Sequence, residues 1–335
     1  MNTHRWRKRR WLAGVVGTVL GLLPLGVTLW LALSWRDRLP GFIVSHWNAQ
    51  GVPDDMTTLG VFLGVLLGIG AGCVLLFSLL AVALGQAAMT RRVCAAFAAG
   101  MGLFMGGVVL TALAPQLDSA ADSSMVLSTA WMMLSLLTAV GYGFGAVWLI
   151  PGDPKLPATE PVPETASRFD LAADMDTVWV KTIEGGVGMT LGLVVGGISV
   201  MLGLLLGVVL RSWHLAVVLS GTGVLVLLLV YGLTQFTVSV DDTGLRARSK
   251  LGWPKLAVPA NEVLEAEAIA STSFLDFGGY GYRTNLKGEV GIITRDGAAL
   301  KVRQTGDRTV YISVDDAARG AALLNSYASR ARSTT

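Results

Sequence analysis

Residues Leu59–Leu84 read LGVFLGVLLGIGAGCVLLFSLLAVAL, without a single Asp, Glu, Lys, Arg or His. A helix of roughly 20 apolar residues crosses a bilayer core about 30 Å thick, so this stretch predicts a transmembrane helix. Five further stretches of similar length and apolar character accompany it: Leu12–Leu33, Val93–Ala114, Met125–Ile150, Val187–Leu210 and Trp213–Thr234. The sequence therefore predicts an α-helical polytopic membrane protein with six transmembrane helices.

The composition of the 335 residues agrees with this prediction. Hydrophobic residues make up 53% of the chain and charged residues 15%, whereas about 25% charged residues is usual for a soluble domain. These values exclude a disordered chain and argue against a single soluble domain. The 2 Cys exclude a disulfide scaffold. The net charge of +3 is too small to indicate a nucleic-acid partner, so the expected partner is the lipid bilayer.

Basic residues near the helix ends predict the orientation, because Lys and Arg are retained on the cytoplasmic side. With the N-terminus inside, its five basic residues share a compartment with Arg91 and Arg92, whereas Arg36, Arg38 and Arg211 lie outside. This predicts a multi-pass plasma-membrane protein with cytoplasmic N- and C-termini. The first apolar stretch is longer than the about 7–15 residues of a signal peptide, which favours an uncleaved helix.

Composition divides the chain into four pieces. Residues 1–150 form a four-helix transmembrane block with an outer loop at 36–58. Residues 151–186 hold a Pro-rich cytoplasmic linker and then a segment that lies on the membrane surface or forms an irregular loop. Residues 187–235 form a two-helix transmembrane hairpin. Residues 236–330 form a cytoplasmic β domain.

Alternating apolar and polar residues indicate the strands of this β domain. They are expected, with turn sequences between them, at residues 236–240, 245–251, 290–294, 298–303 and 309–314. Ser313 and Asp316 resemble a capping box at the start of a helix whose apolar face includes Ala317, Ala321 and Leu324. The patterns predict an antiparallel β domain capped by a C-terminal helix.

Glycines recur every four residues in the second apolar stretch, at Gly60, Gly64, Gly68 and Gly72. In lipid, small residues at this spacing let two helices approach closely and gain van der Waals contact. We therefore assign these glycines to helix packing. A pore lined by glycine backbone is the alternative interpretation.

The outer loop carries a distinctive motif, Leu39-Pro40, His46-Trp47-Asn48 and Gly51-Val52-Pro53-Asp54. This motif resembles the opening loop of a bacterial membrane family of unknown function, to which the Sdp-type toxin immunity proteins are related. The resemblance covers roughly residues 10–85, and no immunity-protein signature follows the fourth helix. In that family the loop likewise follows the first membrane helix and precedes the second, and the resemblance transfers no functional residue.

The C-terminal part resembles the pleckstrin-homology-like domains of actinobacterial membrane proteins. The resemblance rests on residues 278–283, on 297–302 and on the run from Val314 to Asn325. It implies a β-barrel-like sandwich closed by one helix, and it transfers no functional residue.

The outer loop supplies the candidate site residues. Together with Asp54 or Asp55, His46 could bind a metal or hydrogen-bond a peptide, and His214 could complete such a site if two outer loops meet. Ordinary turn and headgroup contacts are the competing interpretation. The residues assigned to candidate ligand or partner contact are His46, Trp47, Asn48, Gly51, Pro53 and Asp54, and neither a metal nor a cofactor is assigned.

Several functional classes lack their sequence signatures here. The chain contains no phosphate-binding GxxxxGK[ST], zinc-binding HExxH or nucleophile GxSxG string. The apolar stretches lack the buried ionisable residues of ion-coupled transporters. We therefore predict a non-enzymatic protein with a sensing, immunity or envelope-protective function. Its partners would be an extracellular peptide or membrane protein at the outer loop and a cytoplasmic protein or lipid at the C-terminal domain. A transporter or channel subunit is the alternative.

Overall fold

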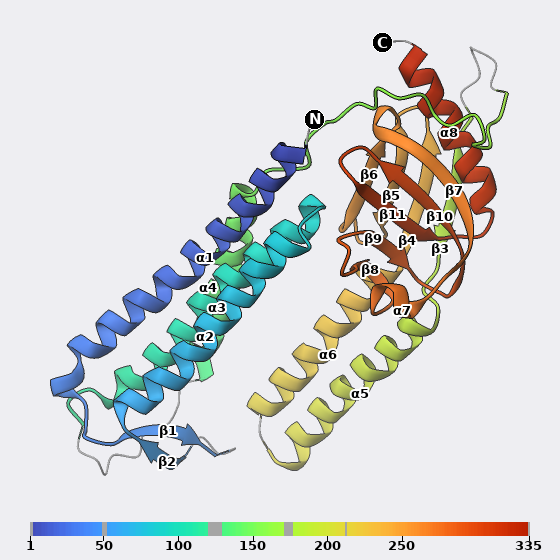
Figure 1. The fold of residues 1–335 in the computed structure, drawn as a ribbon. Coiled ribbons are helices and arrows are strands. Elements are labelled where there is room, and N and C mark those ends of the chain that lie inside the picture. The colour runs from blue at the N-terminus through green and yellow to red at the C-terminus, as the bar shows by residue number, and fades with distance from the viewer. Residues whose placement is uncertain (1–2, 49–51, 120–128, 171–176, 212, 334–335) are drawn as a thin grey trace. The chain divides into compact units, whose positions relative to one another are not determined.

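The computed structural model describes residues 3–48, 52–119, 129–170, 177–211 and 213–333. The chain divides into two compact units, Met1–Asp153 and Pro154–Thr335, both of which are visible in Figure 1. Each unit is described by itself below.

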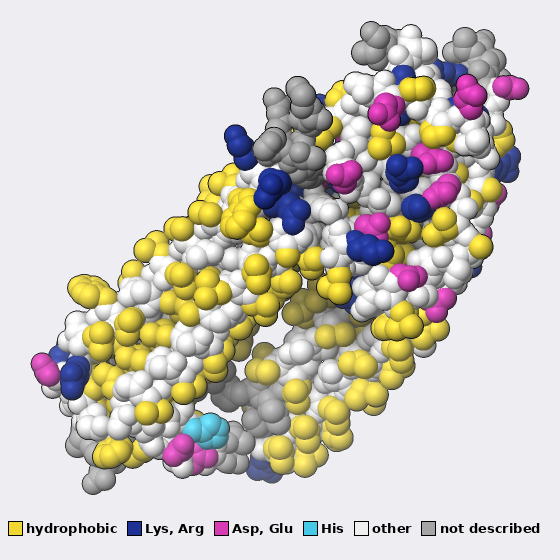
Figure 2. All heavy atoms as spheres, in the orientation of Figure 1, with side chains coloured by type: hydrophobic (Ala, Val, Ile, Leu, Met, Phe, Trp, Pro, Cys, Tyr) yellow, Lys and Arg dark blue, Asp and Glu magenta, His cyan; other side chains and the backbone are white. Residues whose placement is uncertain are grey.

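Six helices in the described residues are long and apolar enough to cross a membrane. They are α1 (Thr3–Ser34), α2 (Leu59–Ala83), α3 (Ala88–Leu113), α4 (Thr129–Leu149), α5 (Val187–Val209) and α6 (Trp213–Thr234). Their surfaces are largely covered by apolar side chains (Figure 2). The prediction of six membrane-spanning helices is confirmed at this level. The start predicted for the fourth, at Met125, lies outside the described residues.

Helix α3 is the centre of the first unit, because it packs against α1, α2 and α4. Small residues make this packing close. A Cβ atom added to Gly102 would lie 2.0 Å from the carbonyl oxygen of Gly21 in α1, and one added to Gly143 in α4 would lie 2.7 Å from that of Ala96. Such backbone-to-backbone contacts are the packing that helices use in lipid.

The four glycines predicted to pack helices do not contact another described helix. A Cβ added to Gly60, Gly64, Gly68 or Gly72 would meet nothing within 4 Å. Helix α2 instead buries a face that includes Phe62, Leu63, Gly70, Val74, Ser78 and Ala81. Within the first unit, close packing depends on glycines of α1, α3 and α4 and on Gly70, because these lie on the faces that meet.

Substitution should separate the two sets of glycines. Gly102→Leu is expected to destabilise the bundle by about 3 kcal/mol, because the new side chain would overlap the backbone of α1. Gly64→Leu is the matched control and should leave stability nearly unchanged. Thermal unfolding of the full-length protein in detergent measures both effects, and equal losses for the two variants would contradict this assignment.

Arginines cap the helices at the end of the first unit opposite the strands β1 (Ile43–Trp47) and β2 (Pro53–Thr57). Arg10 donates to the carbonyl oxygens of Val82 and Ala83 at 2.5 and 2.6 Å, where α2 ends. Arg92 donates to the carbonyl oxygen of Ile150 at 3.1 Å, just after α4. The last carbonyls of a helix lack intrahelical partners and carry partial negative charge, so guanidinium donors stabilise them.

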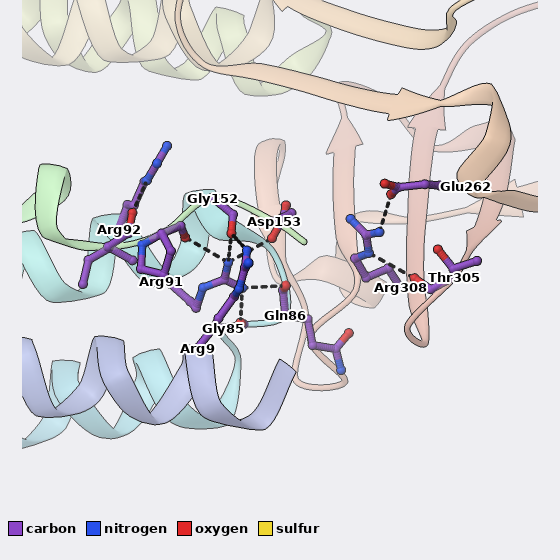
Figure 3. A network of polar contacts seen from close by, with 12 residues as sticks. Arg9, Gly85, Gln86, Arg91, Arg92, Gly152, Asp153, Glu262, Thr305 and Arg308 are labelled. Carbon is purple, nitrogen blue, oxygen red and sulfur yellow. Dashed lines mark hydrogen bonds and ion pairs between the residues drawn. The ribbon is translucent and has the colours of Figure 1, made fainter. Parts of the chain in front are cut away.

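Arg91 holds the same end together from within. Its side chain is fully buried and donates to the carbonyl oxygens of Gly85 and Gln86, both at 2.9 Å. It also forms an ion pair of 3.0 Å with Asp153. Figure 3 shows this network around the α2–α3 turn and the end of α4. A buried guanidinium needs such partners because an unpaired one is costly.

The first sheet of the second unit includes a strand that precedes α5 and α6 in the chain. Strand β3 (Trp179–Ile183) pairs antiparallel with β4 (Phe236–Asp241), with Ile183 opposite Phe236 and Trp179 opposite Val240. Helices α5 and α6 therefore connect two neighbouring strands of one sheet. Strands β5 (Gly244–Ser249) and β6 (Lys255–Pro259) complete the order β3-β4-β5-β6. The surface segment or irregular loop predicted before α5 is thus partly a strand.

The second sheet has the order β7-β10-β11-β9-β8. Its strands are β7 (Val263–Thr272), β8 (Gly281–Thr284), β9 (Val290–Ile293), β10 (Gly297–Gln304) and β11 (Arg308–Ser313). The purely antiparallel prediction is wrong at one point. The short turn between β9 and β10 does not join neighbouring strands of the sheet. Strand β11 lies between them and pairs in parallel with β9. The sheet is therefore mixed.

Helix α8 (Ala317–Ser333) follows the last strand and packs against both sheets, and all of its residues from Gly320 to Ala328 are buried. The predicted capping box at its start is wrong. The buried Ser313 ends strand β11 and donates to the carbonyl oxygen of Arg295 at 3.1 Å. The capping box belongs instead to the short helix α7 (Phe274–Phe277), where Ser273 and Asp276 form it. The unit also contains the short helix η3 (Ala260–Glu262).

The Pro-rich segment is packed against the C-terminal domain rather than running free between domains. Leu156 and Val162 are buried. The N–H of Leu156 donates to Glu262 at 3.1 Å, and its carbonyl accepts from the hydroxyl of Thr305 at 2.5 Å. From Pro154 onward, the predicted linker, the α5–α6 hairpin and the β domain therefore belong to one compact unit.

Glu262 fixes this segment through a buried ion pair. Arg308 donates to Glu262 at 2.6 Å, with side chains only 9% and 4% exposed, respectively, as Figure 3 shows within the second unit. Removing one partner of a buried pair leaves an uncompensated charge, which costs about 3–5 kcal/mol.

Glu262→Ala is therefore expected to lower the stability of the second unit by about 3 kcal/mol or more. Glu265→Ala is the control, since Glu265 pairs with the exposed side chain of Arg303, and an exposed pair contributes about 0–1 kcal/mol. Thermal unfolding of both full-length variants tests this difference. Equal unfolding temperatures would show that the buried pair does not hold the segment.

Candidate functional site

The predicted outer loop folds as a β-hairpin between α1 and α2. After the short helix η1 (Arg36–Arg38), strand β1 (Ile43–Trp47) pairs antiparallel with β2 (Pro53–Thr57). His46 lies opposite Asp55, and Trp47 opposite Pro53. Register shifts on both sides of His46 make the ladder irregular there. The hairpin brings the two halves of the sequence motif together.

A buried glutamine locks the first strand onto the helices. Gln116, in the short helix η2 (Ala114–Gln116), accepts a hydrogen bond from the N–H of Val44 at 2.8 Å. Its amide nitrogen donates to the carbonyl oxygens of Val44 at 3.1 Å and of Ala112 at 2.9 Å. Gln116 therefore satisfies both backbone groups of Val44 on the side of β1 that faces α3.

Apolar contacts complete this attachment. Ile43 is fully buried in a cluster with residues of α1, α2 and α3, and Trp47 packs on the same cluster. Asn48 closes the turn, because its backbone N–H donates to the carbonyl oxygen of Val52 at 2.9 Å and its side chain accepts from the N–H of Val52 at 3.0 Å. Trp47 and Asn48 thus have structural roles in this motif.

His46 and Asp54 form the exposed polar pair of the hairpin. Nδ1 of His46 lies 2.6 Å from a carboxylate oxygen of Asp54, and the side chains are 67% and 41% exposed. Asp55 is also exposed and accepts from the N–H of Met56 at 2.9 Å. The sequence left Asp54 and Asp55 open as partners of His46, and the structure pairs His46 with Asp54. Gly51 and the side chain of His214 lie outside the part of the chain that the structure describes.

Exposed apolar side chains accompany these charges. Phe42, Val52 and Met56 are each about half or more exposed. Figure 2 shows a histidine beside acidic side chains on this part of the four-helix block. We call His46, Asp54, Asp55 and these three apolar residues the hairpin surface. It combines negative charge with apolar area on a fixed backbone.

An exposed ion pair borders the hairpin surface. Arg38 donates to Asp118 through Nε at 3.1 and 3.2 Å and through a second, shorter contact. The hydrogen bonds from Arg38 hold the pKa of the Asp118 carboxyl below its ordinary value. The N–H of Asp118 donates to the carbonyl oxygen of Arg38 at 2.8 Å. This pair joins the end of α1 to the segment after η2.

Sequence reasoning missed Gln116, Arg38 and Asp118. Gln116 could have been noticed as a polar side chain at the end of an apolar stretch, but its partner Val44 lies far away in the sequence. As regards metals, the described residues contain no group of three or more His, Cys, Asp or Glu that could hold an ion. His46 and Asp54 alone supply two donors, and a typical zinc site uses three or four protein ligands.

Comparison with known proteins leaves the chain without an assigned family. No protein-family model matches it, and neither a curated protein nor a solved structure is significantly similar to it. The resemblances to the Sdp-related family and to pleckstrin-homology-like domains therefore remain predictions from the sequence.

Gln116→Leu should loosen the hairpin. It would leave the N–H and carbonyl of Val44 unpaired at a buried position, at a cost of about 1–3 kcal/mol. Hydrogen exchange of the Val44 amide is expected to accelerate by at least about tenfold, the equivalent of 1.4 kcal/mol. Asp118→Asn is the control, since it alters only the exposed pair with Arg38. Unchanged exchange in the Gln116 variant would contradict this role.

Proposed function

We propose that this chain is a non-enzymatic membrane protein with a sensing, immunity or envelope-protective function. Its hairpin surface would contact an extracellular peptide or a neighbouring membrane protein. The observation that supports this most directly is the attachment of β1 by Gln116 and Ile43, which fixes a charged and apolar surface on the helices. A fixed surface loses little conformational entropy on binding.

The chemistry of the hairpin surface favours a cationic, amphipathic peptide. Asp54 and Asp55 supply carboxylates, while Phe42 and Met56 offer exposed apolar area beside them. Lysine or arginine side chains of a peptide would pair with the carboxylates, and its apolar face would cover the aromatic and aliphatic groups. Peptides of this composition are also attracted to membrane surfaces, where the hairpin surface would meet them.

The orientation inferred from the basic residues belongs to the same proposal. Arg10, Arg91 and Arg92 gather at the end of the first unit away from the hairpin. Positive residues mark the cytoplasmic side of membrane proteins, so the hairpin surface would face outward. The alternative of a transporter or channel subunit rested on glycine-rich helices. The close contacts of Gly102 and Gly143 with neighbouring backbones favour helix packing at those positions instead.

The proposal is tested by measuring peptide binding and by measuring the resistance of cells to the same peptide. A synthetic amphipathic peptide of Lys and Leu should bind the full-length protein in phosphatidylcholine nanodiscs more tightly than empty nanodiscs. The double substitution Asp54→Asn and Asp55→Asn should weaken this binding by about tenfold, since two charge contacts of about 0.5–1 kcal/mol each would be lost. Asp242→Asn, an exposed turn residue of the other unit, is the control.

Cells that lack the gene should also be more sensitive to the same peptide. The wild-type gene should restore resistance, and the double variant should not. Equal sensitivity of all strains, together with unchanged binding by the double variant, would refute the proposed function.

A further inference from the structure

The end of the C-terminal domain that adjoins α5 and α6 is built from three loops, which we call the hairpin-end loops. They are residues 250–254, 273–280 and 294–296, which follow β5, β7 and β9. The N–H of Lys250 donates to the carbonyl oxygen of Gln235, after α6, at 3.0 Å. The N–H of Gly186, before α5, donates to the carbonyl oxygen of Thr294 at 3.3 Å. These hydrogen bonds place two of the loops beside the positions where α5 and α6 leave the domain.

Two of these loops extend alongside the helices. A Cβ added to Gly232 of α6 would lie 3.1 Å from Cδ1 of Leu251, and one added to Gly188 of α5 would lie 2.6 Å from Cβ of Tyr280. Gly188 and Gly232 both belong to the candidate membrane spans, Val187–Val209 and Ala216–Thr234. Leu251 and Tyr280 thus lie level with the ends of the spans.

Four exposed side chains of these loops are large and apolar. Leu251 and Trp253 are each about half exposed, Phe274 is 43% exposed, and Leu275 is 85% exposed. Phe274 also contacts Tyr280 edge-to-face, with ring centroids 5.2 Å apart. Phe277, at the end of the four-residue helix α7, is buried, whereas Phe274 and Leu275 at its start are exposed. Trp and Tyr are the side chains that favour the membrane–water interface.

The acidic groups of the same loops are engaged locally. Asp276 accepts from the N–H of Ser273 at 2.8 Å, and Asp296 accepts from the N–H of Phe274 at 2.7 Å. Both carboxylates therefore stabilise the turn that presents Phe274 and Leu275. Lys250 adds an exposed positive charge. The surface is apolar with mixed charge, which suits phospholipid in general rather than a specific anionic headgroup.

We propose that the hairpin-end loops insert Leu251, Trp253, Phe274 and Leu275 into the interfacial region of the bilayer around α5 and α6. The C-terminal domain would then rest directly on the lipid, held by the two helices and by these four side chains. The occupant is phospholipid, because the loops lie level with helix residues that are themselves apolar enough to be in the membrane. This inference concerns a different surface from the hairpin surface and does not depend on it.

Site-directed spin labelling of the full-length protein in phosphatidylcholine nanodiscs tests the proposal. The two natural cysteines are first replaced, as Cys73→Ala and Cys94→Ala, and a nitroxide is attached at Leu275→Cys. Asp242→Cys is the control, because Asp242 follows β4 at the end of that strand away from α6. Strands rise about 3.3 Å per residue, so the control label stands roughly 20 Å from the hairpin end.

The label at position 275 should collide more with oxygen than with a water-soluble nickel complex, and the label at position 242 should show the reverse. Equal access of the nickel complex to both labels would overturn the proposal, because the domain would then stand away from the membrane. A label at 275 that neither reagent reaches would also overturn it, since protein rather than lipid would cover the loops. If the cysteine-free protein does not fold, a fluorescent amino acid at 275, quenched by nitroxide-labelled lipid, gives the same discrimination.

Discussion

Backbone N–H and C=O groups that are buried away from water must find hydrogen-bond partners within the protein. Three features of this chain satisfy that constraint. Gln116 forms hydrogen bonds with both backbone groups of Val44. The fully buried Arg91 donates hydrogen bonds to the carbonyls of the α2–α3 turn. Strand β3 forms backbone hydrogen bonds with β4 next to the point where α5 and α6 leave the domain. The hairpin, the helix ends and the sheet are positioned by these pairings.

The sequence predicted well those features that are encoded in consecutive residues. The six apolar helices, the strand from Phe236 and the C-terminal helix all follow from local patterns of hydrophobicity. Strand β3 was missed because it has only five residues and pairs with a strand more than fifty positions later. The parallel pairing of β9 with β11 was missed for the same reason, since local turns predict antiparallel neighbours. Non-local pairing has no local signature.

In the candidate site, too, the local features could be predicted from the sequence and the non-local ones could not. A meeting of His46 with Asp54 or Asp55 could be expected, because the residues between them are typical of a turn, and the structure pairs His46 with Asp54. The buried partner Gln116 could not be found, since nothing near Val44 indicates it. The glycine spacing of α2 was clear, but spacing alone does not say which face of a helix another helix covers. Only the structure shows that Gly102 rather than Gly64 is in close contact.

The pairing of β3 with β4 has a consequence for biogenesis. Strand β3 is synthesised before α5 and α6, and its partner follows them. The two strands can meet only if the chain crosses the membrane an even number of times between Ile183 and Phe236. A chain that inserts only one of these helices leaves both strands unpaired on opposite sides, with sheet edges open to aggregation. This sheet can therefore be completed only when both α5 and α6 have been inserted.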